Sequence, residues 1–415
     1  LMRSSAASDV YKRQGRNTSI WNENRGWETM RIIHCADIHL DSALTTHLDK
    51  ERARSRRKEI LDTFRRMLFY ASNNDVQAVI IAGDLFDSET VSAATVGIVL
   101  GEIKRHKDLN VYYLRGNHDP GSGIFAGRDI PENLYLFDDE WKYYLLNEEK
   151  DSRENIDTNT EEGSNIVLAG VVLKAGNSAI IYDDLDLRED DINIVTLHGQ
   201  EQEYGRNCGD DVCLGKLKDK GIDYLALGHI HKPKCERLDH RGIYAYSGCL
   251  EGRGFDECGD HGFVLLDIDE KDGTIKTEFV PFAYRRLYEV VVDITGVTDN
   301  QDAADMIAEQ LYMDLNKREE NMEKVLVKII VTGELDVESE VDIDYLTRQF
   351  MDSFYYVNFV DRTRLKIDPL KYVHDATLRG EFVRLVMAQD MSDEDKAFVI
   401  QTGVRALAGE EVWSR

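Results

Sequence analysis

Short apolar runs alternate with longer amphipathic stretches along the chain after Met30. The short runs are rich in Val, Ile, Ala and Tyr, as buried strands are, whereas in the longer stretches apolar residues recur every three or four positions, as on one face of a helix. The predicted order is strand 31–36, helix 51–73, strand 76–82, helix 91–107 and strand 111–114. This alternation predicts a parallel sheet covered by helices, with a ligand site beyond the carboxyl ends of its strands.

Regular structure resumes after a polar, acidic stretch, 147–165, which we expect to be an exposed loop. Further apolar runs follow and predict strands at 166–172, 192–197, 224–227, 242–246 and 263–268. This many strands in one domain predicts two sheets packed face to face with helices outside them. The expected fold over residues 30–285 is therefore an α/β/β/α sandwich.

A smaller α/β unit is predicted over 286–368. Apolar and polar positions alternate around Val290 and again around Val327, and two helical stripes centre on Ile307 and Leu346. Two amphipathic helices are expected in the C-terminal segment, 369–415. Such helices pack on their own domain or offer a docking face for a partner helix, and the sequence leaves both open.

Residues 1–29 lack apolar periodicity and begin with a run similar to translated adapter or vector sequence. We expect them to be an extraneous or disordered arm, with Met30 as the natural start. The remaining composition, 42% hydrophobic and 31% charged residues in a chain of 415, is that of an ordinary globular protein. No apolar stretch approaches the roughly 20 residues of a membrane helix, so no membrane association and a cytoplasmic location are expected.

The formal net charge of -27 argues against binding nucleic acid through a broad basic face. One stretch within 51–66 is nevertheless rich in basic residues. It either contacts phosphates or forms a solvated helix face balanced by Glu51, Glu59 and Asp62, and both interpretations stay open. The basic residues are Arg52, Arg54, Arg56, Arg57, Lys58, Arg65 and Arg66.

Polar side chains of the kinds that bind metal ions follow the predicted strands in five places. The segments are Asp37-Ile38-His39, Gly83-Asp84-Leu85-Phe86-Asp87, Gly116-Asn117-His118-Asp119, His198-Gly199 and Gly228-His229-Ile230-His231. Each segment alone is more often an ordinary turn or a structural histidine than a ligand. Together they contain five of the 11 histidines, and each lies at a strand end, which chance seldom arranges. Imidazole, carboxylate and amide ligands in one site suit manganese, and zinc or iron also fits.

These five segments resemble the pattern of the calcineurin-like metallophosphoesterases: D-x-H, G-D-x-x-D, G-N-H-[DE], a lone H and G-H-x-H. The stretches 34–42, 82–87 and 115–119 are most similar to SbcD-type DNA repair exonucleases, in particular the bacterial YhaO-like branch. The resemblance extends from Met30 to about Arg286. The smaller unit is similar in layout to that family's DNA-capping domain.

The resemblance implies two divalent metal ions, with manganese expected. Asp84 would bridge them, and a hydroxide shared by the metals would attack phosphorus. His118 would act as the general acid on the leaving oxygen, with Asp119 orienting it and Asp87 supporting the site. Arg115 would steady a phosphate, or it forms an ordinary surface salt bridge. One metal would be held by Asp37, His39 and His231, and the other by Asn117, His198 and His229.

The function implied by the resemblance is that of a phosphodiesterase acting as a DNA exonuclease in DNA repair. The C-terminal helices would dock an SMC-like ATPase of the SbcC type or a YhaN-like one, and a homodimer is compatible with the same resemblance. Some archaeal nucleases carry histidine where this chain has Asp87, so that histidine's role does not carry over. A phosphoesterase for a small nucleotide or phosphoprotein is the alternative. A non-catalytic binding subunit is disfavoured because all seven ligand positions are filled.

Overall fold

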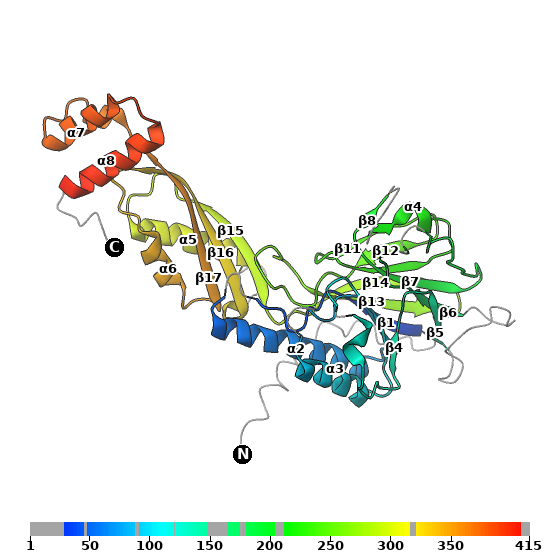
Figure 1. The fold of residues 1–415 in the computed structure, drawn as a ribbon. Coiled ribbons are helices and arrows are strands. Elements are labelled where there is room, and N and C mark those ends of the chain that lie inside the picture. The colour runs from blue at the N-terminus through cyan, green and yellow to red at the C-terminus, as the bar shows by residue number, and fades with distance from the viewer. Residues whose placement is uncertain are drawn as a thin grey trace, which may run out of the picture. The chain divides into compact units, whose positions relative to one another are not determined.

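The structure is a computed structural model, and it describes residues 29–44, 48–87, 91–119, 121–147, 165–174, 177, 180–203, 211–315 and 321–407. The expected N-terminal arm and the expected loop at 147–165 lie almost wholly outside these residues. The chain forms two compact units (Figure 1). The first comprises Leu1–Ala43, Arg54–Leu250 and Gly262–Phe282, and the second comprises Leu44–Ala53, Glu251–His261 and Ala283–Arg415.

The first unit contains a mixed sheet in the order β14-β13-β1-β2-β3-β4. The strands β1 to β4 run parallel to one another, while β13 runs antiparallel to both β1 and β14. Helices α2 (Lys50–Asn73) and α3 (Ala93–Arg105) lie on the outer side of this sheet (Figure 1). The strands are β1 (Thr29–Cys35), β2 (Ala78–Ala82), β3 (Asn110–Leu114), β4 (Leu134–Leu136), β13 (Gly262–Asp269) and β14 (Ile275–Pro281).

A second sheet of the same unit has the order β11-β12-β10-β7-β6-β5. Its central strands β6, β7, β10 and β12 are parallel, and the edge strands β5 and β11 are antiparallel to their neighbours. The strands are β5 (Lys142–Leu145), β6 (Ile166–Gly170), β7 (Ile192–His198), β10 (Tyr224–Gly228), β11 (Lys234–Arg237) and β12 (Ile243–Tyr246). A short pair, β8 (Glu201–Gln202) and β9 (Val212–Cys213), and the short helix α4 (Leu214–Leu217) lie beyond β7.

The main core lies between the two sheets and is built from alternate residues of facing strands. Ile32, Ile80 and Tyr112 of the first sheet and Ile194 and Ala226 of the second are all 0% exposed. Each large apolar side chain buried in this way stabilises the fold by roughly 1.5–3 kcal/mol. The expected two-sheet α/β sandwich is confirmed.

Four strands of the two large sheets were not expected from the sequence. They are β4, β5, β11 and β14. The sheet order places all four at the edges of their sheets. Exposed edge strands do not need apolar residues on both faces, and β11 and β14 are largely exposed. Their sequences therefore lack the continuous apolar run that marked the central strands.

His34 links the two sheets inside the core. The side chain is 0% exposed; its Nε2 donates to the Leu227 carbonyl at 3.2 Å, and its Nδ1 accepts from the Tyr224 hydroxyl at 2.8 Å. A carbonyl oxygen only accepts, which assigns the neutral tautomer with the proton on Nε2. Burial lowers the pKa of His34 to about 3, from the ordinary 6.5.

Because of this lowered pKa, the free energy of unfolding should decrease as the pH falls. Below pH 6.5 the unfolded chain takes up a proton on His34 that the folded chain does not, until the pH approaches 3. We expect the metal-free protein to lose up to about 1.4 kcal/mol per pH unit through this group. Urea unfolding of the wild type and of His34→Gln at pH 7 and pH 5 measures it. The wild type should lose more stability than the variant, and equal losses would contradict the assignment.

The second unit is built on a parallel sheet in the order β15-β16-β17. Its strands are β15 (Arg286–Asp293), β16 (Val325–Asp336) and β17 (Tyr356–Lys366), and its helices are α5 (Asn300–Leu315) and α6 (Ile343–Phe350). Strand β17 continues through Asp361 and Arg362, which lie exposed within it and interrupt only the apolar pattern. Two short segments from before residue 285, Leu44–Ala53 and Glu251–His261, belong to this unit as well.

The C-terminal helices have their own small core. Helix α7 (Leu378–Met387) and helix α8 (Asp393–Leu407) bury Val383 and Ile400 together with Val337, which follows β16. Their outer faces leave large apolar side chains exposed, among them Leu378 at 71% and Phe398 at 62%. One face of each helix therefore packs on its own unit. None of the described helices is long and apolar enough to cross a membrane.

Candidate metal centre

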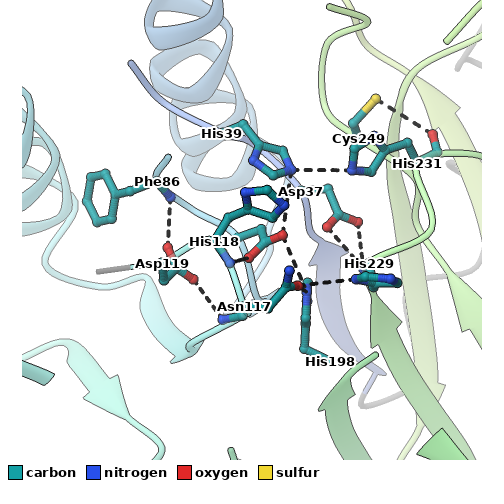
Figure 2. Close-up of polar contacts among 12 residues, drawn as sticks. Asp37, His39, Phe86, Asn117, His118, Asp119, His198, His229, His231 and Cys249 are labelled. Carbon is teal, nitrogen blue, oxygen red and sulfur yellow. Dashed lines mark hydrogen bonds and ion pairs between the residues drawn. The ribbon is translucent and has the colours of Figure 1, made fainter. Parts of the chain in front are cut away.

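All seven candidate ligands lie at the carboxyl ends of five strands or in the loops that follow them. Asp37 and His39 follow β1, Asp84 follows β2, and Asn117 follows β3. His198 ends β7, while His229 and His231 follow β10. Because the strands of the two packed sheets end side by side, the side chains converge in one place (Figure 2). Backbone hydrogen bonds continue the pairing of β1 and β2 into their loops, from Asp37 N to Gly83 O at 3.1 Å and from His39 N to Asp84 O at 3.0 Å.

The backbone at these ligands is strained. Asp37, His39 and Asp84 have φ angles of 51°, 48° and 52°, and His229 has a φ of 102°. Positive φ costs a residue other than glycine on the order of 1–3 kcal/mol, and it persists only where the surrounding structure enforces it. Such strain is common at functional sites, where it aims side chains at a shared point.

One group of ligands brings two imidazoles and a carboxylate together. Potential ligand atoms of Asp37, His39 and His231 lie within 4.8 Å of one another. The Nε2 atoms of His39 and His231 face each other at 3.3 Å. Both oxygens of Asp37 accept the backbone N–H of His229, at 3.0 and 2.9 Å, which fixes the carboxylate and ties the β1 loop to the β10 loop.

A second group surrounds the Asn117 amide. The Oδ1 atom of Asn117 lies 2.9 Å from His198 Nε2 and 3.2 Å from His229 Nδ1. His198 Nδ1 donates to the Ala82 carbonyl at 2.9 Å. That hydrogen bond fixes the ring and directs Nε2 into the site, as the outer partners of metal-bound histidines do.

Asp84 lies between the two groups. Its Oδ2 is 3.6 Å from His39 Nε2 and 3.4 Å from His198 Nε2, and its Oδ1 accepts the backbone N–H of His118 at 2.8 Å. The residue is 1% exposed. A single buried carboxylate thus faces one histidine from each group, which is the position of a bridging ligand.

Three buried side chains of the cluster have shifted pKa values. Burial raises the pKa of Asp37 to about 6. Burial also lowers the pKa of His198, but hydrogen bonding and charge interaction with Asp84 outweigh it and raise that pKa to about 9. Burial disfavours the Asp84 carboxylate as well, yet its hydrogen bond and charge interaction with His198 hold the pKa of Asp84 well below its ordinary value. The donor set of imidazoles, carboxylates and one amide fits divalent metals.

His118 and its neighbours lie at the open side of the site. His118 is exposed, and its ring centroid lies 5.1 Å from that of His39. Asp119 accepts the backbone N–H groups of Phe86 and Gly116, each at 2.8 Å, so it braces the loop that carries His118, and its role in orienting the imidazole stays a prediction. The carboxylate near His118 is Asp87, which forms a group with His39 and His118 whose ligand atoms lie within 4.8 Å of one another.

A comparison with known protein families shows which family this part of the chain resembles. Residues 30–233 match the family model described as calcineurin-like phosphoesterase. This chain contains a calcineurin-like phosphoesterase domain. The resemblance seen in the sequence motifs is confirmed, and the matched range spans the loops that carry all seven candidate ligands.

Relatives of this phosphoesterase extend the similarity beyond the matched domain. The chain is similar to the metallophosphoesterase YhaO of Bacillus subtilis, with 27% identity over 323 residues, 73% of this chain and 72% of the relative. It is also similar to the DNA double-strand break repair protein Mre11 of Saccharolobus solfataricus, with 24% identity over 399 residues, 92% of this chain and 96% of the relative. The corresponding Mre11 protein of Methanopyrus kandleri is 26% identical over 286 residues, which is 64% of this chain and 60% of that relative.

Arg115 of the phosphoesterase domain points to carboxylates. Its Nη2 lies 3.4 Å from Asp138 Oδ1 and 3.6 Å from Asp139 Oδ1. The geometry is that of the ordinary salt bridge, and a role in steadying phosphate stays a prediction. The basic stretch on α2 is also ion-paired: Arg56 contacts Glu59 at 2.8 Å, and Arg65 contacts Asp62 at 2.9 Å. These pairs favour the balanced helix face over a phosphate surface.

The sequence motifs missed an ion pair that ties two ligand loops together. Lys234 Nζ lies 2.8 Å from Glu201 Oε1. Each residue stands three positions beyond a candidate ligand, Lys234 after His231 and Glu201 after His198. Opposite charges at equal offsets from two ligands were visible in the sequence, but the motifs did not indicate that these two side chains face each other.

Gly228 allows the two sheets to approach each other next to the site. A Cβ on this residue would lie 1.9 Å from the Ala82 carbonyl oxygen and 2.8 Å from His198 Nδ1. We expect Gly228→Ala to destabilise the fold by about 1–3 kcal/mol, because the backbone must shift to make room. Gly101→Ala, on α3, is the control: its Cβ meets nothing within 4 Å, and alanine there should stabilise the helix by roughly 0.5–1 kcal/mol. Thermal unfolding measures both, and a neutral Gly228→Ala would refute the close approach.

Proposed function

We propose that the protein is a two-metal phosphodiesterase that acts as a DNA exonuclease in DNA repair. The observation that carries the proposal is the placement of Asp84 between His39 and His198, at 3.6 and 3.4 Å, which makes one carboxylate common to two ligand groups. Two-metal hydrolases of phosphate esters hold their ions about 3.5–4 Å apart with such a bridge. DNA as the substrate is supported by the relatives named for double-strand break repair, one of which aligns over 92% of this chain.

The residues divide into ligands and a proton donor. Asp37, His39 and His231 would hold one ion, and Asn117, His198 and His229 the other, with Asp84 shared. Manganese suits this mixture of ligands. The bound ions would supply an activated water and offset charge on the phosphoryl oxygens. His118, exposed beside the ligands, donates a proton to the leaving oxygen, and Asp87 lies close enough to position it.

The second unit and the terminal helices have proposed roles as well. The parallel sheet of residues 286–368 serves as a capping domain that holds the duplex. The exposed apolar side chains of α7 and α8, including Leu378, Leu385 and Phe398, offer a surface for an SMC-like ATPase of the SbcC or YhaN-like type. The proposed location is the cytoplasm.

One observation favours a second candidate function. The net charge of -27 opposes binding of a polyanion and suits a small phosphoester of a nucleotide or phosphoprotein. The two functions differ in substrate only, because the metal chemistry is shared. The experiment therefore compares substrates on one preparation.

The test incubates the chain from Met30 with manganese and either end-labelled duplex DNA or a chromogenic phosphodiester. Both substrates should be cleaved, and Asp84→Asn, purified in parallel, should cleave neither, which excludes a contaminating nuclease. Cleavage of the small ester with intact DNA, even when the ATPase partner is added, would reject the exonuclease in favour of the second candidate. Failure on both substrates would reject the phosphodiesterase itself.

A further inference from the structure

Two loops of the first unit carry histidines that belong to different metal positions. The loop after β7 begins at His198, and the loop after β10 contains His231. The two strands are held in register up to the site, where Gly228 of β10 is paired with His198. One more backbone bond, from Gly199 N to Gly228 O at 3.2 Å, extends this pairing. Beyond that bond, side chains connect the two loops.

The connection between the loops is the ion pair of Glu201 and Lys234. Lys234 Nζ lies 2.8 Å from Glu201 Oε1, and the two side chains are only 34% and 21% exposed, so water and salt screen the pair in part. Lys234 also donates to the Tyr244 hydroxyl at 3.1 Å and lies 3.3 Å from Glu236 Oε2. Three partners therefore hold the ammonium group in one place, unlike that of a flexible surface salt bridge.

Strands β11 and β12 contact the loop after β7 at a second point. Lys234 on β11 and Tyr246 on β12 lie opposite each other in the antiparallel register. Tyr246 is 0% exposed, and its hydroxyl donates to the Gly199 carbonyl at 2.9 Å. Two neighbouring side chains of this strand pair thus contact the loop, at the first and the third residue after His198.

The loop after β10 is anchored at three points. At its start, the backbone N–H of His229 donates to both oxygens of Asp37. In its middle, the His231 carbonyl accepts the backbone N–H of Cys249 at 3.2 Å, and Figure 2 shows the Cys249 side chain beside the same carbonyl. At its end is Lys234. Of these three anchors, only Lys234 reaches the loop that carries His198.

We infer that Glu201 and Lys234 are positioning residues, which fix His198 and His231 relative to each other before metal ions bind. This role rests on the proposed function, because it serves a site with two metal positions. Ligands that are already in place lose less conformational freedom on binding, which raises affinity. Residues that hold metal ligands in position commonly change metal affinity by about 10–100-fold when they are substituted.

A direct effect of the two charges on a metal ion has a different signature. Lys234 repels a cation and Glu201 attracts it, so neutralising them one at a time would change the affinity for manganese in opposite directions. Loss of positioning weakens binding in both cases, because either substitution breaks the same ion pair. The signs of the two changes therefore distinguish positioning from simple charge attraction.

Calorimetric titration with manganese measures both signs. Glu201→Gln and Lys234→Met keep the size of each side chain, and each should weaken binding by roughly tenfold. The double variant should lose little more than the single variants, because the pair is broken only once. Lys234→Arg should recover most of the affinity, since it keeps the charge and the donors. Lys218→Met is the matched control, because Lys218 pairs with Glu203 of the same loop and should bind manganese as the wild type does.

Hydrogen exchange of the metal-free protein gives a readout that is independent of metal. The amide of Cys249 donates to the His231 carbonyl and reports on the loop after β10, whereas the amide of Val212 donates to the Gln200 carbonyl at 2.7 Å and reports on the loop after β7. Glu201→Gln should speed exchange at Cys249, and Lys234→Met should speed exchange at Val212. Each substitution thus acts on the loop to which it does not belong.

Three results would overturn the inference. They are affinity changes of opposite sign in the two single variants, unchanged affinity in both, and exchange that speeds up only in the substituted loop. A wild-type chain that binds fewer than two manganese ions would contradict the proposed function instead. The exchange of the metal-free protein would then still decide whether the pair positions the two loops, so the inference and the proposed function fail separately.

Discussion

Asp84→Asn is expected to lose both metal ions and to lower phosphodiester turnover by about 10³-fold or more. The substitution keeps the shape of the side chain and an oxygen for the backbone N–H of His118, which Asp84 Oδ1 accepts at 2.8 Å. It removes the buried negative charge that faces His39 and His198. Two cations held close together depend on that charge, so neither stays bound. Metal content measured after gel filtration, together with the turnover number, checks the expectation.

The matched control for Asp84 is Asp129→Asn. Asp129 is an exposed aspartate of the same unit that pairs with Lys104 at 2.7 Å. The Asp129→Asn protein should keep two metal ions and full turnover. An Asp84→Asn protein that retains both ions would contradict the bridging role, whatever its activity.

His118→Ala is expected to keep both ions while turnover on DNA falls by roughly 10²–10⁴-fold. His118 is exposed and is not one of the seven proposed ligands, so those seven side chains should stay in place when it is removed. What is lost is the proton for the leaving oxygen. A nitrophenolate needs little protonation as it leaves, so a nitrophenyl phosphodiester should lose far less rate than DNA does. Steady-state rates on the two substrates, with metal analysis of the same samples, measure the difference.

Two results would count against this role of His118. A metal-depleted His118→Ala protein would make the residue a ligand, and equal losses on both substrates would make it a substrate-binding group. Asp87→Asn provides a companion measurement. If Asp87 positions His118, its substitution should lower turnover on DNA more than turnover on the nitrophenyl ester, as His118→Ala does.

The central strands and the convergence of the motifs were predictable from the sequence. Runs such as 78–82 are apolar at every position because both faces of the strand are covered, and polar residues directly after such runs must gather at one edge of a parallel sheet. That is why Asp37, Asp84 and Asn117 lie together as expected. The edge strands β11 and β14 lacked this signal because half or more of their residues meet water.

Side-chain contacts between loops could not be predicted, because the pattern of apolar and polar residues does not show which loops are neighbours in space. The sequence places Asp119 next to His118 and so favoured a direct contact, but the loop geometry turns the Asp119 carboxylate to the backbone of Phe86 and Gly116. Asp87 approaches His118 from another loop instead. The grouping of Leu44–Ala53 with the second unit was equally invisible, since it rests on contacts between segments far apart in the chain.

Electron paramagnetic resonance of the manganese-loaded chain tests most directly whether Asp84 is shared by two metal ions. Two manganese ions bridged by Asp84 would lie about 3.5–4 Å apart and would be magnetically coupled. At two equivalents of manganese, the predicted spectrum is that of a coupled pair, and Asp84→Asn should abolish it. A spectrum of isolated manganese ions at full occupancy in the wild type would contradict the two-metal site.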